Sequence, residues 1–272
     1  MIYINNELHQ LEAAQGLLRY AREQLQVPIK TTWYEKVQRW TAALEQYNKQ
    51  QLDFPDDLNI MLGRMRCMAS LSDWEGVSNL VDTTLTRLDL TPVQRTEVAT
   101  ISLSAALNLM RWEKMHECIT YLDENLLDAA FYRAIIAVHD GQYNESQRLI
   151  DKARELAATE LTALLGESYS RAYAVVVRIQ QLTELEEVVT YKKLSNDLER
   201  REQLRKLWRR RLEGVERNVE VWQAILAVRS LVVPPTADPE TWIKFANLVR
   251  KSARPRKARK ILTQLLVGTG RD

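Results

Sequence analysis

Apolar residues recur at helical spacing along almost the whole chain. In the clearest stretch, residues 196–231, they follow one another at alternating steps of four and three residues, which places them on one helix face. These residues are Leu204, Trp208, Leu212, Val215, Val219, Trp222 and Leu226. Strict alternation of apolar and polar residues, the pattern of a half-buried strand, is missing everywhere. The pattern therefore predicts an all-α protein.

Polar residues and prolines mark where these helices begin. Two segments, at residues 72–75 and 183–186, match the capping box, in which a hydroxyl and a Glu three residues later satisfy free backbone N–H groups. Pro92 and Pro239 follow a capping residue, so each stands at a first helical position, where the missing N–H costs nothing. Such signals predict medium-length helices joined by short turns.

Four segments share a short polar turn followed directly by an aromatic residue. The aromatic residues are Trp40, Trp74, Trp112 and Tyr143, at spacings of 34, 38 and 31 residues, and a weaker fifth unit begins at Trp242. A period near 34 residues is typical of tetratricopeptide-type hairpins, which bury their apolar faces by stacking on one another. We therefore expect a single superhelical solenoid of tetratricopeptide-like helical hairpins over residues 1–272.

Both ends of this array lack the polar caps with which a solenoid finishes. The helical pattern begins almost at residue 1, and the last helical pattern ends on apolar residues before Gly268. We therefore expect residues 1–272 to be a fragment of a larger chain. The alternative is a free-standing adaptor that binds peptides in its concave face, and such an adaptor needs finished caps.

Charge is unevenly distributed, although the net charge is only +2. Residues 1–191 carry 18 Lys and Arg against 27 Asp and Glu, whereas residues 192–272 carry 20 against 9. The basic part indicates an anionic ligand or an acidic partner, unless the two parts pair with each other. A nucleic-acid binder interleaves aromatic residues with Lys and Arg on an exposed face. Trp208 and Trp222 instead fall on the apolar stripe, so we expect no nucleic-acid partner.

Composition and motifs exclude several other classes. The longest apolar run, residues 172–177, is too short to span a membrane, and the N-terminus has no signal-peptide pattern. Two cysteines, Cys67 and Cys118, cannot form a disulfide framework, which favours a reducing intracellular compartment. No metal-binding, phosphate-loop or nucleophile motif occurs in the sequence. We therefore expect neither a metal site nor a catalytic site.

Several blocks of sequence resemble the FAT region of TOR kinases, and they occur in the same order. The strongest are Glu-Leu-Thr-Ala at 160–163 and Gly-Glu-Ser-Tyr-Ser-Arg-Ala-Tyr at 166–173. Others lie at residues 33–36, 61–67, 130–134, 151–154, 185–188, 228–233 and 241–242. The family is that of the phosphatidylinositol-3-kinase-related Ser/Thr protein kinases, which act in nutrient-sensing complexes.

The resemblance implies a non-catalytic scaffold and regulatory segment that clamps the kinase domain of a TOR-type kinase. Its partners are then that kinase domain, the remaining helical repeats and the TOR complex subunits, all in the cytoplasm, with peripheral membrane association of the parent complex. ATP and Mg²⁺ belong to the kinase domain, whose catalytic motifs are missing from these 272 residues. The resemblance also implies a basic pocket for inositol hexakisphosphate as a structural ligand. The positions carried over to it are Arg171, Lys192 and Lys244, and we expect Lys193, which follows Lys192 in the basic part, to join them.

Overall fold

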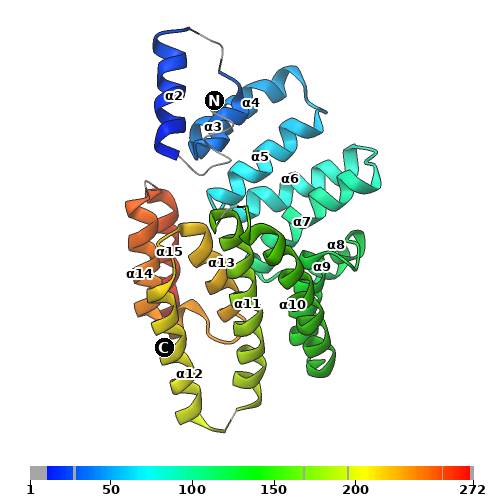
Figure 1. The fold of residues 1–272 in the computed structure, drawn as a ribbon, viewed down its shortest axis with the longest axis vertical. Helices are drawn as coiled ribbons and strands as arrows, with labels where there is room; N and C mark the ends of the chain where they lie inside the picture. The colour runs from blue at the N-terminus through cyan, green and yellow to red at the C-terminus, as the bar shows by residue number, and fades with distance from the viewer. Residues whose placement is uncertain (1–10, 27–28, 168, 195, 253, 270–272) are drawn as a thin grey trace. The chain divides into compact units, whose positions relative to one another are not determined.

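Helices joined by short turns make up nearly all of the computed structural model, which describes residues 11–26, 29–167, 169–194, 196–252 and 254–269 (Figure 1). No β-strand occurs among these residues. The chain divides into two compact units, Met1–Leu122 and Asp123–Asp272. The predicted all-α class is confirmed.

The first unit consists of helices that pack on their neighbours in sequence, from α3 through α8. Its described helices are α2 (Leu11–Glu23), α3 (Thr31–Lys36), α4 (Trp40–Asp53), α5 (Leu58–Ser70), α6 (Trp74–Arg87), α7 (Pro92–Leu109), α8 (Trp112–Cys118) and the short 3-10 helix η1 (Ile119–Tyr121). Met61 and Met65 of α5 are fully buried with Val77 and Val81 of α6, and these side chains form the centre of this unit.

The second unit is built around one long helix, α11, which packs against α10, α12 and α13. The described helices of this unit are α9 (Leu127–His139), α10 (Tyr143–Leu165), α11 (Tyr169–Lys193), α12 (Leu198–Gly214), α13 (Val219–Arg229), η2 (Pro235–Ala237), α14 (Pro239–Lys251) and α15 (Pro255–Thr269). A second cluster of buried apolar side chains joins α12 to α15, with Trp222 and Phe245 among them. Packing between sequence neighbours is that of an all-α helical solenoid.

The four predicted turns share one backbone geometry. Helices α4, α6, α8 and α10 begin at the predicted aromatic residues, Trp40, Trp74, Trp112 and Tyr143. Two positions before each aromatic residue stands a residue with positive φ, and these residues are Gln38 (58°), Ser72 (58°), Met110 (55°) and Gly141 (76°). A left-handed residue of this kind ends the preceding helix and redirects the chain. The predicted turn positions are therefore confirmed, and the four turns are equivalent.

The stretch of residues 196–231 forms two helices rather than one continuous face. The first, α12, ends at Gly214, and α13 begins at Val219. Asn218 starts the second helix, because its side-chain oxygen accepts hydrogen bonds from the backbone N–H groups of Glu220 and Val221. The apolar stripe survives this break, since residues from both helices enter the same buried cluster.

One predicted capping box is wrong and the other is displaced by one residue. Thr183 lies in the middle of α11, where its hydroxyl donates to the Ile179 carbonyl, so no helix begins there. Residues 183–186 match a capping box, but the apolar helical pattern continues on both sides of them, so the helix is not interrupted. In α6 the cap is Asp73, whose carboxylate accepts from the Gly76 N–H, and Ser72 supplies the left-handed turn.

Candidate functional site

The four residues predicted to bind a polyphosphate fall in three separate places. Helix α11 is continuous from Tyr169 to Lys193. At 1.5 Å rise per residue, Arg171 and Lys192 lie about 30 Å apart along its axis. The side chain of Arg171 lies outside the described residues. Because of this separation, Arg171 and Lys192 do not line one small-molecule site.

Lys192 and Lys193 contribute to helix packing at the end of α11. The Lys192 ammonium donates to the Val138 carbonyl at 3.0 Å, in the last turn of α9, where a cation is favoured by the helix dipole. Burial lowers the pKa of Lys192. The Lys193 ammonium lies 5.4 Å from the centre of the Tyr143 ring, at the start of α10. These contacts join α11 to α9 and α10.

Lys244 lies on an exposed face of α14, between two carboxylates. Its ammonium is 3.0 Å from a Glu240 oxygen and 3.1 Å from a Glu213 oxygen. Hydrogen bonds to Glu240 and to Glu213 raise the pKa of Lys244, so it remains protonated at neutral pH. Lys244 therefore offers a permanent positive charge, which these two carboxylates partly offset.

Lys244 also lines a pocket of about 460 Å³ that two further cations share. Its lining residues are Glu213, Arg217, Trp222, Lys244, Asn247, Leu248 and Lys251, and we call this site the basic pocket. Arg217 and Lys251 form no ion pair with any residue that the structure describes. Three cations against one carboxylate make this pocket suited to an anion.

Trp222, which lines the basic pocket, has a buried indole N–H without a hydrogen-bond partner among the described residues. The Trp222 side chain is only 7% exposed. Its Nε1 is buried and has no hydrogen-bond partner within the described part of the chain. A buried donor without a partner costs free energy, so a side-chain movement that brought this N–H to an acceptor would be favourable.

Local sequence explains how these residues come together. Lys244, Leu248 and Lys251 recur at steps of four and three, so they share one face of α14. Arg217 stands in the turn between α12 and α13, directly before the Asn218 cap that starts α13. Sequence reasoning missed Arg217 because it is isolated in the sequence and joins the other cations only through folding.

A buried ion pair joins α11 to α13, the helix that carries Trp222. Glu184 of α11 accepts two hydrogen bonds from the Arg229 guanidinium of α13, at 2.7 and 2.8 Å, and both side chains are almost fully buried. The Gln180 amide donates to the same carboxylate at 2.8 Å. Two parallel hydrogen bonds fix the relative orientation of the two side chains. This pair therefore ties α13 firmly to α11.

A second bond network ties α12 to the same helix. The Trp208 indole donates to the Glu187 carboxylate at 2.8 Å, and Arg211 donates to both oxygens of that carboxylate at 2.7 Å. Trp208 is 3% exposed and its ring stacks on Tyr191, 5.7 Å between centres. This burial agrees with the place of Trp208 on the apolar stripe of the sequence. Several cations of the basic part, among them Lys192, Arg209 and Arg211, therefore join neighbouring helices.

Reactive groups elsewhere in the described residues are held in unreactive states. Cys67 and Cys118 are buried and unpaired, and burial raises the pKa of Cys67 to about 12 and also raises that of Cys118. No group of three or more His, Cys, Asp or Glu residues suited to a metal ion occurs in the described ranges. Within the same ranges, no helix combines the length and the apolar character needed to cross a membrane.

The chain matches a known domain family over more than half its length. The model of the FAT domain matches residues 99–270. The chain is 43% identical over 98% of its length to the serine/threonine-protein kinase TOR of Arabidopsis thaliana, and 42% identical over 98% to the serine/threonine-protein kinase mTor of Drosophila melanogaster.

A yeast relative shows the same degree of similarity. The serine/threonine-protein kinase TOR2 of Saccharomyces cerevisiae is 40% identical over 99% of the chain. The chain spans only 11–12% of the length of these relatives. The resemblance to the FAT region of TOR kinases is confirmed, and the chain belongs to the FAT domain family.

Proposed function

We propose that this chain is a non-catalytic helical scaffold segment of a TOR-type Ser/Thr protein kinase. In this role it clamps the kinase domain of the parent chain, and the parent protein acts in the cytoplasm. The observation that supports this most is the 40–43% identity to TOR kinases over nearly the whole chain. The buried braces on α11 also support it, because a helical segment must be stiff to hold another domain in place. Further partners are the remaining helical repeats and the TOR complex subunits.

Binding between separately purified parts tests this role. The chain is mixed with the kinase domain of its parent protein, and association is measured by sedimentation velocity. We expect a complex, and we expect the parent kinase to lose most of its substrate phosphorylation when residues 11–269 are deleted. A chain that binds peptides but not the kinase domain, with full activity of the deleted parent, supports the free-standing adaptor instead.

We propose further that the basic pocket binds an inositol polyphosphate as a structural ligand. Arg217 offers a planar donor fork, and Lys244 and Lys251 offer point charges, all of which suit phosphate groups. Trp222 and Leu248 supply the apolar part of the pocket wall. Of the four residues predicted from the sequence, only Lys244 belongs to this proposed site.

A thermal melt with inositol hexakisphosphate tests the pocket. Ligand at about 100 times its Kd stabilises a protein by about 2.7 kcal/mol, so we expect the Tm to rise by roughly 5–10 °C. The rise shrinks as salt increases, because charge holds the ligand. The variant Lys244→Gln/Lys251→Gln loses most of this shift.

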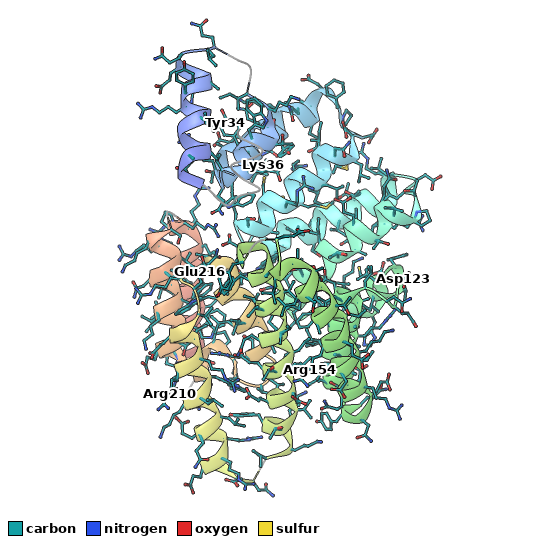
Figure 2. The ribbon with its side chains drawn as sticks, in the orientation of Figure 1. Tyr34, Lys36, Asp123, Arg154, Arg210 and Glu216 are labelled. Carbon is teal, nitrogen blue, oxygen red and sulfur yellow. The ribbon has the colours of Figure 1, made fainter. Side chains whose placement is uncertain are left out.

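The matched control removes two cations from a different surface. Lys206 and Arg210, the latter labelled in Figure 2, lie on the exposed face of α12 and are not among the pocket residues. The variant Lys206→Gln/Arg210→Gln keeps the wild-type shift if the pocket is the site. An equal loss in both variants means that the polyphosphate responds only to net charge, and this rules out the pocket.

A further inference from the structure

One lysine of the second unit is buried among three helices. Lys257 lies in the first turn of α15 and is only 8% exposed. Its ammonium donates to the Gln223 side-chain oxygen on α13 and lies 5.4 Å from the centre of the Phe245 ring on α14. A lysine in such surroundings loses most of its hydration, which disfavours the charged form.

Lys257 contacts the two helices, α13 and α14, that carry most of the residues lining the basic pocket. Gln223 and Phe245, its two contacts, are the chain neighbours of Trp222 and Lys244, which line that pocket. On each of these two helices, the residue that Lys257 contacts is the sequence neighbour of a residue that lines the pocket. Charges in the pocket act on Lys257 through the protein interior, where salt screens them far less than at the surface.

The charged groups around Lys257 do not neutralise it. The charges that act on Lys257 are those of Glu220 on α13 and Arg254 just before α15, whereas Lys244 on α14 pairs with Glu213 and Glu240, and Asp238 beside η2 pairs with Arg209. Glu220 pairs with Arg254 at 2.6 Å. Burial, and then the charge of Arg254, lower the pKa of Lys257 to about 7, against the opposing effect of Glu220. No histidine occurs after His139, so residues 140–272 hold no side chain that ordinarily titrates near neutral pH.

Resting on the proposed polyanion pocket, we propose that Lys257 takes up a proton when a polyanion binds, so that binding tightens as the pH falls. A polyanion in the pocket favours the charged lysine over the neutral one. By linkage, the protonated chain then binds the polyanion more tightly than the neutral chain by the same factor. Protonation of Lys257 and binding of the polyanion therefore favour each other, although Lys257 itself is not a lining residue of the pocket.

Titration calorimetry with inositol hexakis-sulfate tests this coupling. Sulfate esters stay fully ionised from pH 6 to pH 8, so any pH dependence comes from the protein. We expect binding about fivefold tighter at pH 6 than at pH 8, the effect of raising the pKa of Lys257 by one unit from about 7. Measurements at pH 7.5 in two buffers of different ionisation enthalpy should show a fractional proton uptake on binding.

Two variants assign the effect to one residue. Lys257→Met keeps the length of the side chain and should bind with an affinity that no longer depends on pH. Lys260→Met, which removes an exposed cation from the same helix, should keep both the pH dependence and the proton uptake. Proton uptake is measured on the wild-type chain, so it tests the coupling between binding and protonation even if Lys257→Met fails to fold.

The outcomes separate this inference from the pocket itself. Binding of equal strength from pH 6 to pH 8, without proton uptake, overturns the role of Lys257 and leaves the pocket standing. Unchanged pH dependence in Lys257→Met overturns it as well. Absence of binding at every pH overturns both the pocket and the coupling.

Discussion

At the scale of single residues, Trp208 connects three helices of the second unit. Its indole donates to Glu187 and its ring stacks on Tyr191, both on α11. The guanidinium of Arg229, on α13, lies 5.9 Å from the centre of the same ring. Trp208 is almost wholly buried and makes one hydrogen bond and two ring contacts. It therefore contributes more to the free energy of unfolding than its buried apolar area alone would.

Trp208→Ala is expected to destabilise the chain by about 3–5 kcal/mol, because it removes a large buried aromatic group and leaves a cavity. Urea unfolding monitored by circular dichroism measures this loss. Trp208→Phe keeps most of the ring contact and should cost less. An unfolding midpoint that does not move for Trp208→Ala contradicts the burial of this side chain.

Gly63 shows where the absence of a side chain matters. A Cβ atom at Gly63 of α5 would overlap the Tyr47 ring of α4, whose hydroxyl donates to Glu35. Gly63→Ala should therefore destabilise the chain, by an overpacking cost of about 1–3 kcal/mol. Gly16 of α2 has open space around it, so Gly16→Ala should stabilise the chain by up to about 1 kcal/mol. Thermal unfolding of both variants checks the opposite signs.

At the scale of elements, α11 holds its neighbours through paired charges gathered in one helical turn. Arg154 on α10, labelled in Figure 2, donates to the Glu186 carboxylate at 2.6 Å, which lowers the pKa of Glu186. Glu184 binds Arg229 of α13, and the next carboxylate, Glu187, binds α12. Three acidic residues within one helical turn therefore reach three different helices.

Breaking the buried pair alone should cost more than removing both partners. Arg229→Met leaves the Glu184 carboxylate buried without its cation, and we expect a loss of about 3–5 kcal/mol. Glu184→Met/Arg229→Met removes both charges and should recover most of that loss. Denaturant unfolding of the single and double variants measures the difference. A double variant that loses more than the single one contradicts the account of this brace.

The sequence predicts helix class and turn positions well, because apolar spacing and the aromatic residue after each turn are local signals. It predicts caps less well. Thr183 matches a capping pattern inside α11, and only the packing of the whole helix overrides that pattern. The break between α12 and α13 has its own signals, Gly214 and Asn218, but an unbroken apolar stripe masks them.

At the scale of the whole molecule, the basic C-terminal part is only partly available to ligands. Arg209 and Arg211 pair with Asp238 and Glu187, and Arg254 pairs with Glu220. Such pairings depend on which helices meet, so charge counts along the sequence do not reveal them. The same reason explains why the sequence does not predict that Arg217 joins Lys244 in one pocket.

A crystal structure of the chain grown with inositol hexakisphosphate tests the proposed site most directly. The account predicts ligand density in the basic pocket, with phosphate oxygens about 2.7–3.2 Å from the nitrogens of Arg217, Lys244 and Lys251. Ligand density at Lys192 and Lys193 instead, or an empty pocket at a ligand concentration that raises the Tm, contradicts it.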